Sequence, residues 1–206
     1  MLTFKRAVST TLAIAASIGA MAFAANAQAA DSYLGAAWGV RTTSDLNCAV
    51  GAVCERASKS TGKIFGGYNF ASTPYNGFTL TQGIEGMLYQ IGDTKGTFHT
   101  ASTLKNGTGK STGAGIFYKV DLGNETFGVT GKIGTSYARS NVDFTAGGKD
   151  SEKAWFMPAI GLGMRYNLTK EVALTADWDR LPSKFSGTNS AKTINNVFSV
   201  GVAYKF

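Results

Sequence analysis

The feature that most constrains the fold of this chain is a two-residue alternation of apolar with small or polar side chains after residue 31. In the final segment, FSVGVAYKF, aromatic residues and valines from Phe198 to Phe206 alternate with Ser, Gly, Ala and Lys. Helical spacing is not sustained anywhere in this part of the sequence. Successive side chains of a strand point to opposite faces, so this period predicts β-strands with one apolar face.

The alternation predicts eight strands, separated by connections of two kinds. The strands are expected at 32–40, 61–70, 78–91, 112–122, 126–139, 154–168, 171–181 and 193–206. Long polar connections are expected at 41–60, 92–111, 140–153 and 182–192, and short ones at 71–77, 123–125 and 169–170. Tight turns at one end and long loops at the other predict an all-β, antiparallel up-and-down meander, which can close into a barrel.

The composition of the polar face indicates which face points into the barrel. Gly and Ala dominate it, with five isolated charges: Glu85, Lys119, Lys132, Arg165 and Asp177. Glycine weakens a strand, so a water-exposed surface has no need of so many. The narrow lumen of an eight-stranded barrel does require small residues around a few long ones. A lipocalin-like soluble barrel, with its apolar face inward, is the alternative that this composition disfavours.

The apolar face carries aromatic residues near both ends of the strands. Phe70, Phe78, Phe127, Tyr166, Tyr204 and Phe206 lie toward the short turns, and Trp38, Tyr137 and Trp178 toward the long loops. Two aromatic belts around an aliphatic band are typical of a barrel that faces lipid. Lipid cannot satisfy a free strand edge, so a spanning sheet must close. The sequence therefore predicts an eight-stranded transmembrane β-barrel.

The five inward charges and one proline carry more local expectations. An unpaired buried charge is costly, and in so narrow a lumen these five side chains must lie close together. We therefore expect a connected salt-bridge network that plugs the barrel at mid-height. Pro158 falls within a predicted strand and cannot donate a ladder hydrogen bond, so we expect a bulge or a local gap there.

The N-terminal 29 residues read as a cleaved secretory signal peptide. Lys5 and Arg6 precede an uncharged stretch rich in Ala, Leu, Ile, Met and Phe, which ends in the small residues ANAQAA. This pattern favours cleavage after Ala27 or after Ala29, and a transmembrane helix is the alternative that the small-residue end disfavours. We expect one domain, an outer-membrane β-barrel over residues 30–206.

The two cysteines, Cys48 and Cys54, lie in the stretch SDLNCAVGAVCER of the first long connection. Both belong to the exported part of the chain, where disulfides persist. We expect a disulfide between them, although spacing alone does not establish that the geometry permits one. A metal site is the alternative, and the lack of a nearby histidine weighs against it.

A nucleotide site and a nucleic-acid surface are both disfavoured. Residues 107–112, GTGKST, end like a P-loop, but that motif also needs a glycine where Leu104 stands and a helix after the loop. The alternating stretch GAGIFYKVDL follows instead, so we expect a polar loop that enters a strand. The net charge of +7 falls by two on loss of Lys5 and Arg6, and no basic run interleaves with aromatics. No cofactor or metal is expected.

Two stretches carry a resemblance to a known family. MPAIGLGMRYNLTKEVALTADWDRL contains Pro158, the Gly161/Gly163 pair, Tyr166 and a Thr-x-Glu turn at Thr169 and Glu171, followed by an alternating strand. The chain also ends in VGVAYKF, with a terminal aromatic and alternate apolar residues before it. Both stretches resemble the small Gram-negative outer-membrane barrels of the OmpA-like and opacity-protein (surface antigen) group. The resemblance implies location in the cell outer membrane. It also implies that Tyr204 and Phe206 act as an assembly signal for the barrel-assembly machinery.

Three classes of function remain open for such a barrel. The first is a non-enzymatic surface protein, which displays four loops for envelope integrity, adhesion or contact with a host ligand. The second is a narrow pore for small solutes. The third, which we favour least, is a lipid A-modifying enzyme, for which His99, Ser102 and Asp93 are the candidate residues.

Outer-membrane lipids and lipopolysaccharide are the expected partners of the outward surface. Arg139 and Arg180 fall on the outward parity near the long loops, with Lys110 and Lys153 close by. Basic side chains in this position could contact lipopolysaccharide phosphates. Solvated interface charges are the alternative interpretation.

Overall fold

The computed structural model describes residues 32–44, 57–58, 61–99, 104–184 and 192–206. The strands in chain order are β1 (Ser32–Ser44), β2 (Ala57–Ser58), β3 (Thr61–Tyr75), β4 (Phe78–His99), β5 (Leu104–Gly123), β6 (Phe127–Phe144), β7 (Lys149–Asn167), β8 (Val172–Lys184) and β9 (Lys192–Lys205). The expected signal peptide, Cys48 and Cys54 lie outside the described residues. In the part of the chain that is described, no helix is long and apolar enough to cross a membrane.

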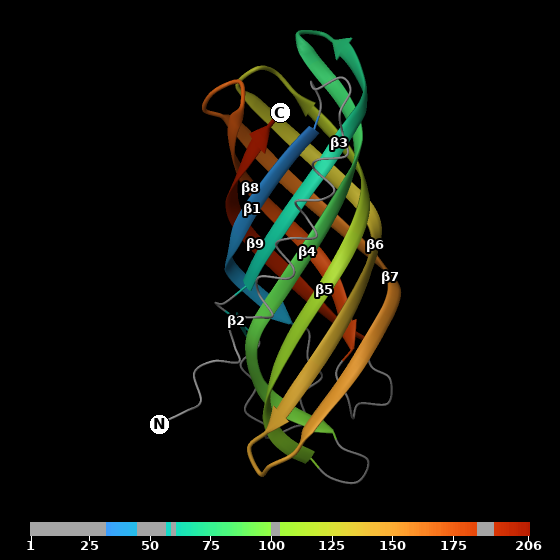
Figure 1. The fold of residues 1–206 in the computed structure, drawn as a ribbon, viewed down its shortest axis with the longest axis vertical. Helices are drawn as coiled ribbons and strands as arrows, with labels where there is room; N and C mark the ends of the chain where they lie inside the picture. The colour runs from blue at the N-terminus through green and yellow to red at the C-terminus, as the bar shows by residue number, and fades with distance from the viewer. Residues whose placement is uncertain (1–31, 45–56, 59–60, 100–103, 185–191) are drawn as a thin grey trace.

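The strands form one closed antiparallel ring. Each strand from β3 to β8 pairs with the next strand along the chain. β1 closes the ring by pairing with both β3 and β9. The two-residue β2 pairs with β1 in the same register as β3 does, so β2 extends the line of β3 and adds no ninth wall position. Figure 1 shows the strands tilted around the barrel axis. The predicted eight-stranded up-and-down barrel is confirmed.

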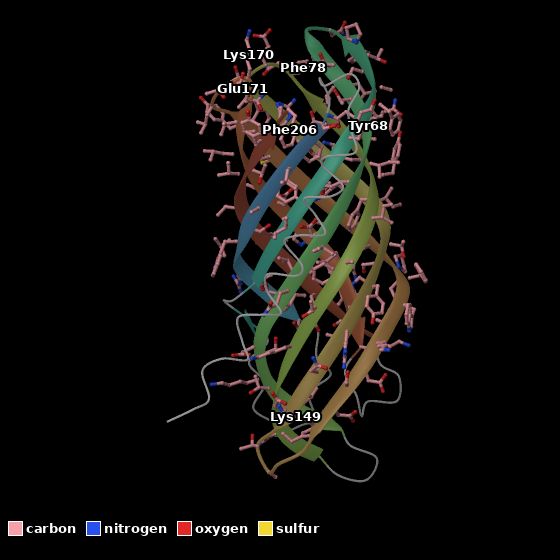
Figure 2. The ribbon with its side chains drawn as sticks, in the orientation of Figure 1. Tyr68, Phe78, Lys149, Lys170, Glu171 and Phe206 are labelled. Atoms are coloured by element: carbon pink, nitrogen blue, oxygen red, sulfur yellow. The ribbon has the colours of Figure 1, made fainter. Side chains whose placement is uncertain are left out.

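Burial follows the two-residue period around the ring. In β5, the odd-numbered residues from Gly107 to Gly123 face inward and most are buried, whereas exposed residues such as Ile116 and Tyr118 face outward. Many aromatic residues are exposed on this outer surface. Figure 2 shows Tyr68, Phe78 and Phe206 at the short-turn end and Lys149 at the opposite end. The large exposed apolar side chains therefore form the outer surface of the wall.

The predicted loops at 92–111 and 140–153 are largely wrong, because strands occupy most of both segments. β4 continues to His99 and β5 begins at Leu104, while β6 ends at Phe144 and β7 begins at Lys149. Backbone pairing holds these hairpins together, and pairing does not require an apolar outer face. The GTGKST stretch accordingly lies inside β5 rather than in a loop before it. Polarity marks the end of the lipid-facing band here, not the end of the strands.

The short turns use local side-chain chemistry. Asn76 and Gly77 both have positive φ, of 46° and 80°, which suits a two-residue hairpin between β3 and β4. The β3–β4 hairpin extends past the neighbouring turns at this end (Figure 1). Between β7 and β8, the Thr169 hydroxyl accepts hydrogen bonds from the backbone N–H groups of Glu171 and Val172, at 3.2 and 3.0 Å.

The wall is irregular beside Pro158. The pairing of β6 with β7 shifts register there, and Phe156 adopts a φ of 42°, in the region that non-glycine residues rarely occupy. The ladder between β7 and β8 ends at Ile160 and Arg180. Its register, if continued, would place Pro158 opposite Pro182, and neither residue has an N–H to donate. The expected bulge and local gap are both present.

Candidate functional site

The lumen holds a central group of charged side chains, which we call the ion cluster: Lys63, Glu85, Lys132, Asp177 and Asp179. The Lys132 ammonium lies 3.0 Å from Glu85 Oε1 and 3.1 Å from Asp179 Oδ1. The Lys63 ammonium lies 2.9 Å from Asp177 Oδ2 and 2.6 Å from Asp179 Oδ2. Lys132 also approaches Asp177 at 3.6 Å. Two ammonium groups, from β3 and β6, therefore bridge three carboxylates, which come from β4 and β8.

The side chains of the ion cluster are largely buried. The side chains of Lys63 and Lys132 are 3% and 2% exposed, and that of Asp179 is fully buried. The Tyr33 hydroxyl donates a 2.6 Å hydrogen bond to Glu85 Oε2, so both oxygens of this carboxylate have partners. Buried charges are stable only with such partners, because each has lost its water. The cluster thus ties β1 and four other strands together across the lumen.

Two glycines of β7 give the carboxylates their space. A Cβ on Gly161 would lie 2.5 Å from Asp179 Oδ1 and 2.8 Å from Lys132 Cε. A Cβ on Gly163 would collide with the Asp177 carboxylate. The inward glycines therefore allow long charged side chains from facing strands to meet within a narrow lumen.

A second ion pair lies nearer the short turns. Arg165 contacts both oxygens of Asp121: Nε is 3.1 Å from each, and Nη2 is 2.9 Å from Oδ1. The Thr130 hydroxyl donates to Asp121 Oδ2 at 2.7 Å. A bidentate arginine–carboxylate pair is strong and fixes orientation. It braces β5 against β7.

Lys119 has a different environment from the other inward charges. Its ammonium lies 4.1 Å from the centre of the Tyr33 ring, a cation–π contact. Among the ion pairs of the described residues, none includes Lys119, although the residue is only 9% exposed. Lys119, Arg165 and three members of the ion cluster (Glu85, Lys132 and Asp177) line a cavity of about 240 Å³. This cavity extends to Ser32 and Lys205 at the short-turn end.

The lumen on the long-loop side of the ion cluster is filled by an apolar layer, which the sequence analysis did not anticipate. Its members are Met87, Tyr89, Ile91, Phe117, Leu181 and Val197, all at most 4% exposed. Phe65 is also buried and packs with this group, but it lines the cavity on the short-turn side. Cation–π contacts join the two regions: the Lys63 and Lys132 ammonium groups lie 5.4 and 5.9 Å from the Phe65 and Phe117 rings. The lumen is therefore not lined by Gly, Ala and charges alone.

A layer of hydroxyl and amide side chains lies beyond the apolar layer, toward the long loops. Asn195 accepts a 2.7 Å hydrogen bond from Ser44 and donates to Ser183 at 2.9 Å. The Ser111 and Ser140 hydroxyls are 2.7 Å apart. These neutral groups satisfy one another, as buried polar groups must.

All five charges singled out from the sequence lie on the inner wall, but their contacts differ. Ion pairs link Glu85, Lys132 and Asp177 to one another, while Arg165 pairs with Asp121 and Lys119 packs on Tyr33. Sequence reasoning missed Lys63, Asp121 and Asp179 as members of the ion pairs. Their inward parity, which Asp121 shares with Lys119 and Asp179 shares with Asp177, was the signal that could have found them.

The other candidate residues lie outside the lumen. Arg139 is exposed, and its Nε donates to Ser151 at 3.2 Å; Arg180 is also exposed and outward. Asp93 forms an exposed ion pair with Lys110 at 3.2 Å. The side chain of His99, and all of Ser102, fall outside the described residues. The Tyr204 and Phe206 rings, 5.2 Å apart, form an exposed edge-to-face pair at the end of β9.

Comparison with known proteins identifies the family. The profile of the outer membrane protein β-barrel domain matches residues 10–206, nearly the whole chain. The chain belongs to this family. It is therefore an outer-membrane barrel, as the resemblance in its sequence implies, and its location is the cell outer membrane. No curated protein sequence matches the chain significantly.

Two solved structures illustrate the likeness of fold. Ail, the attachment invasion locus protein of Yersinia pestis, shares 15% identity with a TM-score of 0.53, covering 87% of this chain and 100% of its own. Neisserial surface protein A shares 17% identity with a TM-score of 0.50, covering 85% of this chain and 97% of its own. At such low identity the likeness concerns the fold alone.

Proposed function

We propose that this protein is a closed, non-conducting outer-membrane barrel that displays its long loops and contributes to envelope integrity, adhesion or surface interaction. The observation that supports it best is the ion cluster beneath the apolar layer. Paired charges and close-packed apolar side chains follow each other along the lumen, so a hydrated ion would have to displace both. A water-filled pore has a polar lumen without such an apolar barrier.

Single-channel recording in a planar bilayer tests this proposal. The folded mature protein should give no steady conductance, only rare and brief openings. Large continuous conductance of the wild type would reject the closed barrel and favour the narrow pore. Detergent-solubilised protein that runs at the same gel position with and without boiling would show that the sample was not a folded barrel.

A non-enzymatic role is part of the same proposal. In the enzyme alternative, Asp93 would have to act with His99 and Ser102, yet Asp93 is half exposed and pairs with Lys110. In a catalytic triad, the orienting carboxylate is instead buried and hydrogen-bonded to the histidine. Incubation of the barrel with lipid A, followed by mass spectrometry of the lipid, tests this; a change in acyl chains would favour the enzyme.

Lipopolysaccharide is the partner that we propose for the outer surface. Arg139 lies directly opposite Lys153 across the β6–β7 ladder. Like charges in this position repel, and a bound phosphate would relieve the repulsion. The Lys153 ammonium also lies 6.0 Å from the centre of the Trp155 ring. That ring lies 4.6 Å from the Tyr137 ring and is tilted by 50° to it. Arg180 is the second arginine of this proposed contact surface.

Thermal unfolding with and without lipopolysaccharide tests this partner. Arg139→Gln and Arg180→Gln should each reduce the stabilisation that lipopolysaccharide confers. Lys170→Gln is the matched control, because Lys170 lies in the turn at the opposite end of the barrel (Figure 2). If lipopolysaccharide stabilised the arginine variants as much as the control, Arg139 and Arg180 would not be part of the contact surface.

Three further proposals concern export and assembly of the chain. Deletion of Phe206 should reduce outer-membrane levels much more than total expression, because the barrel-assembly machinery would lose its signal; normal outer-membrane levels would contradict that role.

Cys48 and Cys54 should be bridged after export, and thiol labelling of both in unreduced, denatured protein would exclude the disulfide. N-terminal sequencing of the mature protein decides between cleavage after Ala27 and after Ala29.

A further inference from the structure

The cavity between the ion cluster and the short-turn end has the features of a binding site. Its volume of about 240 Å³ is well above the roughly 10–15 Å³ that one water molecule needs. Its lining includes Ser32 and Lys205, the first residue of β1 and the last of β9, so it extends to the periplasmic end of the barrel. Glu85, Lys132 and Asp177 of the ion cluster form its floor.

Lys119 lines this cavity, and none of the ion pairs among the described residues includes it. It is buried, and its ammonium contacts the face of the Tyr33 ring. Lys132, in contrast, has three carboxylates within 3.6 Å. A buried ammonium without a carboxylate partner is costly, and a bound anion would offset that cost.

The charges of this half of the lumen do not balance. Ion pairs and the cavity lining place five cations here, Lys63, Lys119, Lys132, Arg165 and Lys205, against four carboxylates, Glu85, Asp121, Asp177 and Asp179. Lys205 donates a 3.0 Å hydrogen bond to the neutral Asn167 side chain rather than to a carboxylate. The excess positive charge lies on the cavity side of the ion cluster, where an anion would be attracted.

Neutral polar groups around the cavity also lack partners. Thr175 and Asn69 both line it, and in the described structure Thr175 Oγ1 and Asn69 Oδ1 are buried without a hydrogen-bond partner. A threonine hydroxyl can donate a hydrogen bond to an anion. An amide oxygen can accept a hydrogen bond from the O–H group of a protonated oxyanion. Buried polar groups without partners are uncommon, so a bound molecule would account for both.

We propose that this cavity is a periplasmic binding site for a small oxyanion, of the size of hydrogen phosphate or a short dicarboxylate. The Lys119 ammonium is the principal contact, and Arg165 and Lys205 supply further positive charge. Thr175 and Asn69 hydrogen-bond the anion. The site lies on the short-turn side of the ion cluster, so an anion reaches it without crossing the lumen.

Titration of the mature protein in phosphatidylcholine nanodiscs tests the site. Hydrogen phosphate and succinate are added at constant ionic strength, with chloride as the reference anion, while backbone amide NMR shifts are followed. Saturable shifts at the cavity residues are expected with at least one of the two oxyanions. Shifts that match those of chloride, or that are confined to the extracellular ends of the strands, would overturn the proposal.

Lys119→Met is the decisive variant, because it keeps an unbranched side chain, one atom shorter, and removes the charge. It should weaken oxyanion binding by at least about tenfold. Lys149→Met is the matched control, since Lys149 lies at the far end of the barrel (Figure 2) and should leave binding unchanged. Unchanged affinity in folded Lys119→Met protein would overturn the site. If this variant does not fold, Thr175→Val, which removes only the hydroxyl, must weaken binding.

A soluble headgroup probe distinguishes two sources of the phosphate. Glycerophosphocholine carries the phosphodiester of a lipid headgroup, and it is titrated in parallel with hydrogen phosphate. Saturable binding of either probe supports the site, and the tighter of the two identifies a lipid headgroup or a free anion as its source. If neither these probes nor succinate saturates it, the proposal fails, whatever the bilayer recordings show about conductance.

Discussion

The half of the lumen nearest the short turns contains charged side chains and a cavity, whereas the half nearest the long loops is packed with apolar and neutral polar groups. In the first half, stability depends on the partners of each charge, such as Lys132 among Glu85, Asp177 and Asp179. In the second, it depends on close packing around side chains such as Leu181. The comparison teaches that one narrow barrel can be stabilised by two kinds of interaction, which should fail in different ways.

Lys132→Ala should produce the largest effect on both stability and conductance. It removes the ammonium that pairs with Glu85 and Asp179 and leaves buried carboxylates short of a partner, at a cost of about 3–5 kcal/mol. Equilibrium unfolding in urea measures this loss, and bilayer recordings should show more frequent openings. A fully stable, silent variant would mean that water already solvates the ion cluster.

Leu181→Ala should destabilise the barrel without opening it. Leu181 is 1% exposed in the apolar layer, and such truncations cost about 2–5 kcal/mol. Because the ion cluster stays intact, conductance should remain at the wild-type level. Openings as frequent as those of Lys132→Ala would show instead that the apolar layer is the principal barrier.

Gly161→Ala should sharpen the comparison by crowding the ion cluster without removing a charge. The added methyl group would lie 2.5 Å from Asp179 Oδ1, and overpacking of this kind costs about 1–3 kcal/mol. Gly131→Ala is the control, because a Cβ there meets nothing within 4 Å. The control should unfold at the wild-type urea concentration or slightly above it, and equal losses in both variants would contradict the steric explanation.

Lys149→Met should have the smallest effect. Its ion pair with Asp143 spans 3.3 Å, but the two side chains are 84% and 54% exposed. Solvated pairs contribute less than about 1 kcal/mol. The urea midpoint should therefore hardly move, and a loss as large as that of Lys132→Ala would show that burial does not explain the difference between these lysines.

The extent of the strands shows where sequence reasoning stops being sufficient. The alternation correctly predicted eight strands, their inward parity and the lipid-facing belts, because period two follows from the backbone of any strand. It ended β4 and β6 too early, at residues 91 and 139, whereas they continue to His99 and Phe144. Beyond the lipid there is no apolar face to mark a strand, and hydrogen bonds to the next strand maintain it.

The sequence by itself determined that this chain is a lipid-facing barrel and that certain charges point inward. Parity places Glu85, Lys119 and Lys132 on the inner wall whatever their neighbours are. Only the tertiary structure decided which charges meet, because strand tilt and register set the height of each side chain. Lys63 and Asp179, 116 positions apart in sequence, form a 2.6 Å contact across the lumen, while Lys119 reaches no carboxylate among the described residues.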